Sequence, residues 1–220
     1  MVRLVPYVRF LWAVRRGIRP GLFDRDYYRA ACPGVIPRLF PLLHFFLVGA
    51  FEGRKPHPLF DTEFYLRQHP EVAEAQVNPL AHYLRFGGSG DRKPHPLFDP
   101  HFYLARYGDV REAGINPLLH FVRNGASEGR KPHPLFQPDY YVRGCPIART
   151  TGENPVVHFL NTDPANCASP HLLFDCQSYL EAKRDASAQH PNPLIDYLLS
   201  GQRIATEGAC QIGWGKRASA

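Results

Sequence analysis

The sequence lacks the short motifs that mark several common catalytic and metal sites. It has no P-loop, and no two cysteines stand at the CxxC spacing of zinc and thioredoxin-like sites. Asp24 and Asp26 flank Arg25, but Asp24 occupies the helix-capping position that Asp61 occupies later in the chain, so no acidic pair is set up for a metal–nucleotide complex. We therefore expect no catalytic residue, no cofactor and no metal ion in this chain.

Paired cysteines and long apolar runs are also missing. The five cysteines, at positions 32, 145, 167, 176 and 210, show no pairing pattern, which indicates a reducing compartment. The apolar run 8–14 is far too short to span a bilayer, and arginines lie in it and beside it. No cleavable signal peptide is recognised. We expect a cytoplasmic location, with peripheral attachment to the inner membrane as the alternative.

What the sequence has in abundance is a repeat. The eight residues Arg54–Asp61 recur almost unchanged as Arg92–Asp99 and Arg130–Gln137, 38 residues apart each time. The 22 prolines recur at fixed places in this period, so they separate short elements and do not form a disordered tract. No segment alternates apolar and polar residues as a strand would. The pattern predicts an all-α fold, a solenoid-like array of five repeats of about 38 residues.

Each repeat is expected to contain about three short helices. Asp61 and Asp99 can cap one helix, and Asn-Pro pairs at 78–79, 116–117, 154–155 and 192–193 open another. We interpret Gly49, Gly87, Gly125 and Gly201 as the C′ residues of positive φ that close it. The predicted parts are an N-terminal segment 1–21, repeats 22–58, 59–96, 97–134, 135–172 and 173–203, and a loose tail 204–220.

The segment 1–21 is predicted to be a basic amphipathic helix. Leu4, Val8, Leu11 and Trp12 share helical spacing among five arginines. In one interpretation it is a capping helix over the open apolar end of the first repeat, which a solenoid requires. In the other it lies on an anionic membrane surface. We favour the cap, because a solenoid must be capped whereas membrane binding is optional.

A histidine recurs in the last predicted helix of four repeats, and Asp196 takes its place in the fifth. One such residue per helical unit places neighbours about 10 Å apart, which is too far for them to share a metal ion. We interpret them as buried side chains that hydrogen-bond the backbone of the neighbouring repeat, a structural inter-repeat role that a carboxylate can also fill. These histidines are His44, His82, His120 and His158.

The best candidate for a binding surface is a basic row with one cluster at each of three repeat junctions. A net charge of +6 permits an anionic partner. Such a row suits a protein partner, an anionic glycan or a membrane surface, whereas nucleic acid is not expected. Alternatively, its arginines pair with Glu52, Asp91 or Glu128, and its cations satisfy helix C-terminal carbonyls. The basic row comprises Arg54, Lys55, His57, Arg92, Lys93, His95, Arg130, Lys131 and His133.

The repeat resembles a known one. It is similar to the helical repeat that accompanies bacterial glycosyltransferases of O-antigen, rhamnan and related surface-polysaccharide biosynthesis. The likeness covers about residues 22–200 and is strongest in 50–141. The segments that carry it are Phe60–Leu66, Pro70–Ala73, Asn78–Leu84 and Glu128–Pro132.

The resemblance implies a role in surface-polysaccharide biosynthesis, but it does not imply that this chain itself transfers sugars. The chain has no room for a Rossmann-like nucleotide-sugar domain beside the repeats. Our leading hypothesis is therefore a non-catalytic scaffold or interaction module in bacterial surface-polysaccharide assembly. One alternative is a glycosyltransferase-related enzyme without a recognisable catalytic domain. The other is a peripheral membrane anchor that uses residues 1–21.

Overall fold

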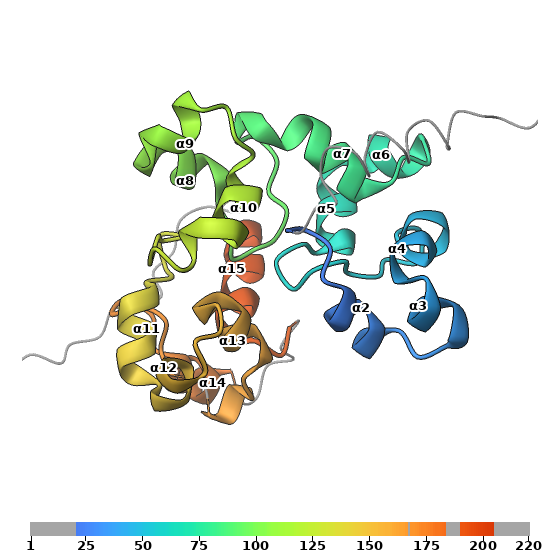
Figure 1. Cartoon of the computed structure of the whole chain (residues 1–220). Helices are drawn as coiled ribbons and strands as arrows, with labels where there is room; N and C mark the ends of the chain where they lie inside the picture. The colour runs from blue at the N-terminus through green and yellow to red at the C-terminus, as the bar shows by residue number, and fades with distance from the viewer. Residues whose placement is uncertain (1–20, 167, 184–189, 205–220) are drawn as a thin grey trace, which may run out of the picture.

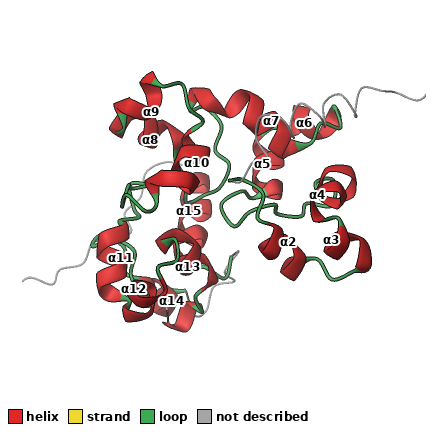
Figure 2. Ribbon diagram, in the orientation of Figure 1, coloured by secondary structure: helices red, strands yellow, loops and turns green. Residues whose placement is uncertain are grey.

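The computed structural model describes residues 21–166, 168–183 and 190–204. Within these ranges the chain is helical, with isolated β-bridges but no strand (Figure 2). The prediction of an all-α fold is therefore confirmed. The predicted N-terminal helix and C-terminal tail lie outside the described residues, apart from Gly21 and Ile204 at their inner ends.

The predicted repeats, called units one to five here, contain short helices that follow one another closely (Figure 1). Units one to four each hold three α-helices, as predicted, and a π-helical turn extends the last helix of units one and three. In chain order the elements are α2 (Arg25–Ala31), α3 (Val35–Leu39), α4 (Pro41–His44), η1 (Phe45–Gly49), α5 (Thr62–Gln68), α6 (Pro70–Glu74), α7 (Pro79–Phe86), η2 (Gly87–Ser89), α8 (Pro100–Arg106), α9 (Gly108–Glu112), α10 (Pro117–His120), η3 (Phe121–Gly125), α11 (Pro138–Gly144), α12 (Pro146–Thr151), α13 (Pro155–Asn161), η4 (Pro164–Asn166), α14 (Cys176–Ala182) and α15 (Pro193–Ile204).

The capping residues act as the sequence predicts. The Asp61 carboxylate accepts the Phe64 N–H at 2.8 Å, and the Asp99 carboxylate accepts the Phe102 N–H at 2.9 Å. The side-chain oxygens of Asn78 and Asn116 each accept an N–H from the first turn of their helix at 3.1 Å. Helices of seven or eight residues are marginal alone, so these caps and the packing between helices hold them.

Helices end at or beside Gly49, Gly87 and Gly125 as predicted, but the positive φ expected of these glycines is wrong. Gly87 has φ −80, and Gly49 and Gly125 are not among the described glycines of positive φ. Gly201 lies inside α15. A Cβ at Gly49 would overlap the Tyr28 hydroxyl, and one at Gly125 would overlap the Tyr103 hydroxyl. Glycine is needed at these two positions because a tyrosine side chain approaches the backbone, not because the chain turns there.

The core of each unit is a cluster of aromatic rings. In unit three, Phe98, Tyr103 and Phe121 are fully buried, with ring centroids 5.5–5.9 Å apart. The other units repeat this cluster with equivalent residues. Rings at these separations and tilts are in the favoured range for aromatic pairs. Each unit therefore has a core of its own, which explains why the aromatic residues keep the period of the repeat.

Backbone hydrogen bonds join the start of each of the first four units to the segment that ends it. The N–H of the residue that precedes the first helix donates to a proline carbonyl near the end of the same unit. The four bonds run from Asp24 to Pro56, Asp61 to Pro94, Asp99 to Pro132 and Gln137 to Pro170, at 2.8–2.9 Å. In the first three units this segment is Pro-His-Pro, and its histidine is buried instead of exposed.

The last helix also contacts units that are not its neighbours in the sequence. Tyr197, Leu198 and Leu199 of α15 line a hollow together with Phe64 of unit two and His133 of unit three. Figure 1 shows α15 near the middle of the molecule. In a simple solenoid each repeat contacts only its neighbours. The prediction of a solenoid is therefore not confirmed.

Candidate functional site

The histidines of the basic row are buried and neutral. His57, His95 and His133 have exposed fractions of 7%, 2% and 8%. The Nδ1 atom of each accepts the backbone N–H two residues later at 3.0–3.1 Å. Burial lowers the pKa of His57 to about 4, that of His95 to about 3 and that of His133 to about 4. Their placement in a cationic surface row was wrong, because the segments that carry them are buried and bonded to the start of their own units.

The lysines and arginines of the basic row are largely used inside the fold. Lys55 pairs with Asp61 and Lys93 with Asp99, each at 2.7 Å. The Arg130 guanidinium makes two bonds to the Asp109 carboxylate, at 2.8 and 2.9 Å, and also pairs with Glu128. These contacts correspond to the alternative in which the row is internally neutralised.

The remaining arginines of the row, Arg54 and Arg92, also bond to groups within the fold. Arg54 bonds Glu52 at 3.2 Å. Arg92 donates to the Phe86 carbonyl at 3.3 Å, as expected for a cation near a helix C-terminus, and lies over the Phe86 ring. The basic row is therefore a weaker candidate for a binding surface than the sequence indicated.

Unit four lacks the lysine–aspartate pair of the two units before it. Gln137 stands where they have Asp61 and Asp99, and its side chain makes no cap bond. Its backbone N–H still donates to Pro170, as its counterparts do. The backbone at Gln137 thus has the arrangement seen at Asp61 and Asp99, but no carboxylate is there to cap the helix or to pair with Lys131.

Gln137→Asp is expected to raise the free energy of unfolding by about 1 kcal/mol. Most of the gain should come from the new N-cap, since a partly exposed ion pair with Lys131 adds little. Urea unfolding measures the change. Gln137→Asn is the matched control: it supplies the cap without the charge and should give most of the gain. Two variants no more stable than the wild type would contradict the equivalence with Asp99.

A tyrosine binds the recurring histidine of its own unit. Tyr28 Oη lies 2.8 Å from His44 Nδ1, and Tyr65 Oη lies 2.8 Å from His82 Nδ1. The pairs Tyr103–His120 and Tyr141–His158 repeat the contact at 2.9 and 2.8 Å. In unit five the Tyr179 hydroxyl donates to the Asp196 carboxylate at 2.7 Å.

These bonds correct the inter-repeat role expected of His44, His82, His120 and His158. Their partner is a side chain of the same unit, 16 or 17 residues earlier, not the backbone of a neighbouring unit. Because a carboxylate takes the same place in unit five, we assign the histidine nitrogen as acceptor and the tyrosine as donor. Burial lowers the pKa of His82 and His120, which keeps this acceptor unprotonated. The tyrosines recur with the same period, and that was the signal that sequence reasoning missed.

One further motif match has no catalytic context. Residues 125–129 read Gly-Ala-Ser-Glu-Gly, the spacing of a hydrolase nucleophile elbow, a match that sequence reasoning missed. That elbow needs a strand-to-helix turn that exposes the serine. Here the segment follows a helix, and the Ser127 hydroxyl donates to the Asn124 carbonyl at 2.7 Å. Ser127 is therefore not in the setting of an activated nucleophile.

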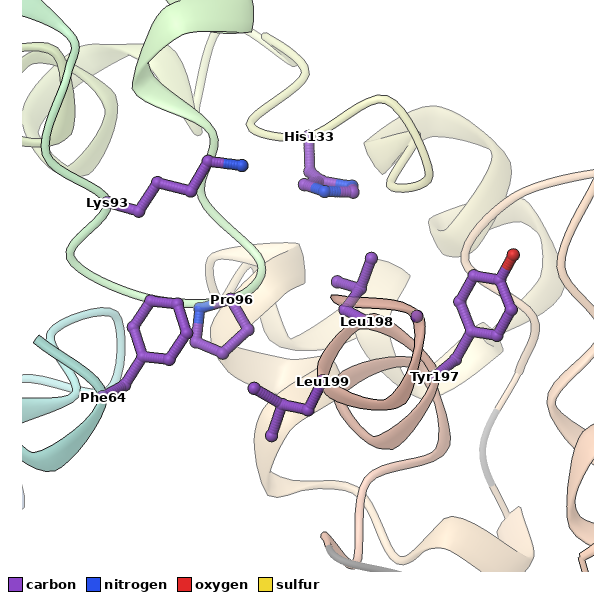
Figure 3. Close-up of a pocket in the computed structure, with 8 residues that line it drawn as sticks. Phe64, Lys93, Pro96, His133, Tyr197, Leu198 and Leu199 are labelled. Carbon is purple, nitrogen blue, oxygen red and sulfur yellow. The ribbon is translucent and has the colours of Figure 1, made fainter. Parts of the chain in front are cut away.

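The hollow beside α15 is small and mostly apolar. Its volume is about 280 Å³ (Figure 3). Of its two basic side chains, Lys93 is paired with Asp99, and His133 is buried and neutral. Among the described residues no three His, Cys, Asp or Glu side chains gather as they would for a metal ion. The lining residues are Phe64, Lys93, Pro96, His133, Tyr197, Leu198, Leu199 and Gly201.

The most unusual surface of the described chain is an apolar face on unit one. Seven large hydrophobic side chains from α3, α4, η1 and the residues beside them have exposed fractions of 42–64%. Leu43, Leu47 and Phe51 follow one another at four-residue spacing. Patches of this kind mark interaction sites in folded proteins. This surface, the unit-one face, comprises Ile36, Leu39, Phe40, Leu43, Leu47, Val48 and Phe51.

The other units show that the fold does not require these apolar residues. At the 37-residue spacing that relates Cys32-Pro33 to His69-Pro70, Ile36 corresponds to Ala73 in unit two and Arg111 in unit three. Where unit one has Leu47, units two and three have arginine, and where it has Phe51, they have serine. A terminal repeat is expected to have a polar outer face, so unit one departs from that rule. Alignment of the repeats contained this signal, and the sequence analysis missed it.

Comparison with protein-family models, with curated proteins and with solved structures finds no match. Within the described ranges, every helix falls short of the length and apolar character needed to cross a membrane. The candidate site therefore rests on the geometry of this chain alone. Of the surfaces considered, the unit-one face is the one whose side chains are not used inside the fold.

Proposed function

We propose that this chain is a non-catalytic scaffold, in which five units act as one rigid array that presents the unit-one face to a partner. The single observation that carries the proposal is the contrast between two sets of side chains. The recurring histidines are bonded to tyrosines or to backbone inside the fold, and the lysines are paired with aspartates. The large apolar side chains of unit one are exposed.

The resemblance of the repeat suggests where such a scaffold works. We place it in bacterial surface-polysaccharide assembly, on the cytoplasmic side of the inner membrane. In that role the array holds a partner in place and leaves sugar transfer to another protein. The repeated tyrosine–histidine bonds and the backbone bonds between the start and the end of each unit support rigidity, because each fixes two parts of the unit.

Titration calorimetry with nucleotide sugars tests the non-catalytic part of the proposal. The full chain is titrated with uridine, guanosine and thymidine diphosphate sugars, with and without Mg²⁺ or Mn²⁺. We expect no binding heat from a protein that is helical by circular dichroism. Micromolar binding that depends on the metal would overturn the proposal and favour a glycosyltransferase-related enzyme.

A further inference from the structure

We infer that the unit-one face docks on an anionic lipid surface. The inference rests on the proposed function, since it names the partner of the surface proposed there. A lipid partner must account for three features of this face: its apolar side chains, its place in the chain and the charge around it.

The apolar side chains have the size and arrangement of an interfacial anchor. The leucine, isoleucine and phenylalanine side chains of this face are about half exposed. Moving their apolar surface from water into a lipid environment lowers the free energy. They come from short consecutive helices, and no described helix could cross a bilayer. Such a surface lies in the interfacial region of a membrane and does not span it.

Unit one is the most positively charged of the five units. Its residues 22–58 contain five lysines and arginines against three acidic residues, a net charge of +2, and the segment 1–20 that precedes it in the sequence adds five arginines. Residues 59–220 contain sixteen lysines and arginines against seventeen acidic residues, a net charge of −1. Exposed arginines of unit one, Arg25, Arg29 and Arg38, belong to this excess. Clustered cations beside exposed apolar side chains favour an anionic lipid surface.

The same charges disfavour the other occupants of this face. A second copy docked face to face would bring two positively charged units together. The segment 1–20 contains five arginines and no acidic residue, so its charge also opposes its docking on unit one.

Vesicle co-sedimentation of the full chain tests the inference. The probes are vesicles of phosphatidylcholine alone and of phosphatidylcholine mixed with phosphatidylglycerol. We expect binding to the mixed vesicles that weakens with added salt, and much weaker binding to the neutral ones. The test variant is Ile36→Glu/Leu47→Arg/Phe51→Ser, which introduces the arginine and serine of units two and three at the last two positions and leaves the net charge unchanged. It should lower the partition coefficient about tenfold or more.

The chain offers a matched control. Ile147, Leu172 and Leu173 are also exposed apolar residues, in unit four, with exposed fractions of 66%, 77% and 52%. Ile147→Glu/Leu172→Arg/Leu173→Ser makes the same three exchanges without a change of net charge, and should bind vesicles as the wild type does. Circular dichroism and urea unfolding check that both variants fold. If the unit-one variant does not fold, Leu47→Arg alone carries the test, with a smaller loss.

Several outcomes would overturn the lipid partner. One is a wild type that does not sediment with the mixed vesicles. Another is a unit-one variant that binds as the wild type does while Trp12→Glu abolishes binding, because the anchor would then be the N-terminal segment. A third is a wild-type dimer in sedimentation equilibrium that the unit-one variant dissolves, without vesicle binding; the docking surface would then remain, with a second copy as its partner. The nucleotide-sugar titration stays a separate test of the proposed function.

Discussion

Acidification from pH 7 to pH 5 is expected to unfold most of this protein. His57, His95 and His133 are buried, and burial lowers their pKa to about 4, 3 and 4. In the unfolded chain their pKa returns to about 6.5. Below pH 6.5 the unfolded state therefore binds more protons than the folded state, and stability falls with pH until the folded pKa is reached. Each histidine then costs about 2 kcal/mol at pH 5.

Three such groups together cost about 6 kcal/mol, which equals the lower end of the stability of an ordinary domain, about 5–15 kcal/mol. Burial also lowers the pKa of His82, His120, His171 and His190, so these groups act in the same direction. Asp61 and Asp99 have a lowered pKa beside their lysines, and their contribution is lost only at still lower pH. Urea unfolding at pH 7, 6 and 5 measures the slope. A free energy of unfolding that stays constant over this range would contradict the prediction.

A substitution at one histidine tests the cause of the acid effect. His57 Nδ1 accepts the Leu59 N–H, and an asparagine side chain can accept the same N–H two residues later without titrating. His57→Asn should therefore reduce the proton uptake on unfolding by nearly one between pH 6 and pH 5. His171→Asn is the matched control, because His171 makes the same bond to Leu173 but is less buried. It should change the slope less.

The sequence predicted the local elements well because their causes are local. Asp61, Asp99 and the Asn-Pro pairs determine where helices begin through bonds within one turn. The period of the repeat indicated which residues are equivalent. Neither observation says how units far apart in the sequence are placed in space. The hollow that α15 lines together with residues of units two and three was therefore not predicted.

The errors came from residues whose role depends on contacts between elements. His57 stands between prolines and close to Arg-Lys, which is typical of an exposed loop, but that segment is buried and bonded to the start of its own unit. His120 was predicted to bond a neighbouring unit, because a period of 38 residues does not show whether a side chain faces its own unit or the next one. Its actual partner, Tyr103, lies in its own unit. Glycine has two uses, positive φ and close approach, and the sequence alone did not distinguish them at Gly125.

Gly125→Ala is expected to destabilise the protein by about 2–3 kcal/mol, although alanine is the better helix former. In a helix interior this exchange ordinarily gains up to about 1 kcal/mol, and the φ of Gly125 is not positive. The added Cβ, however, would overlap the buried Tyr103 hydroxyl. The tyrosine must then shift, which strains the aromatic cluster and stretches its bond to His120. The overlap therefore outweighs the gain in helix propensity.

A double-mutant cycle with Tyr103→Phe identifies the overlap as the cause. Tyr103→Phe alone should cost about 1 kcal/mol, through loss of the bond to His120. In that background the nearest atom to the new Cβ is Phe121 Cδ2 at 3.2 Å, so Gly125→Ala should cost less than about 1 kcal/mol. The expected favourable coupling of about 1–2 kcal/mol is well above the error of urea unfolding. Gly108→Ala is the control, since no atom lies within 3.5 Å of its added Cβ, and it should change stability little. Strictly additive costs for Gly125→Ala and Tyr103→Phe would mean that the hydroxyl is not what requires glycine there.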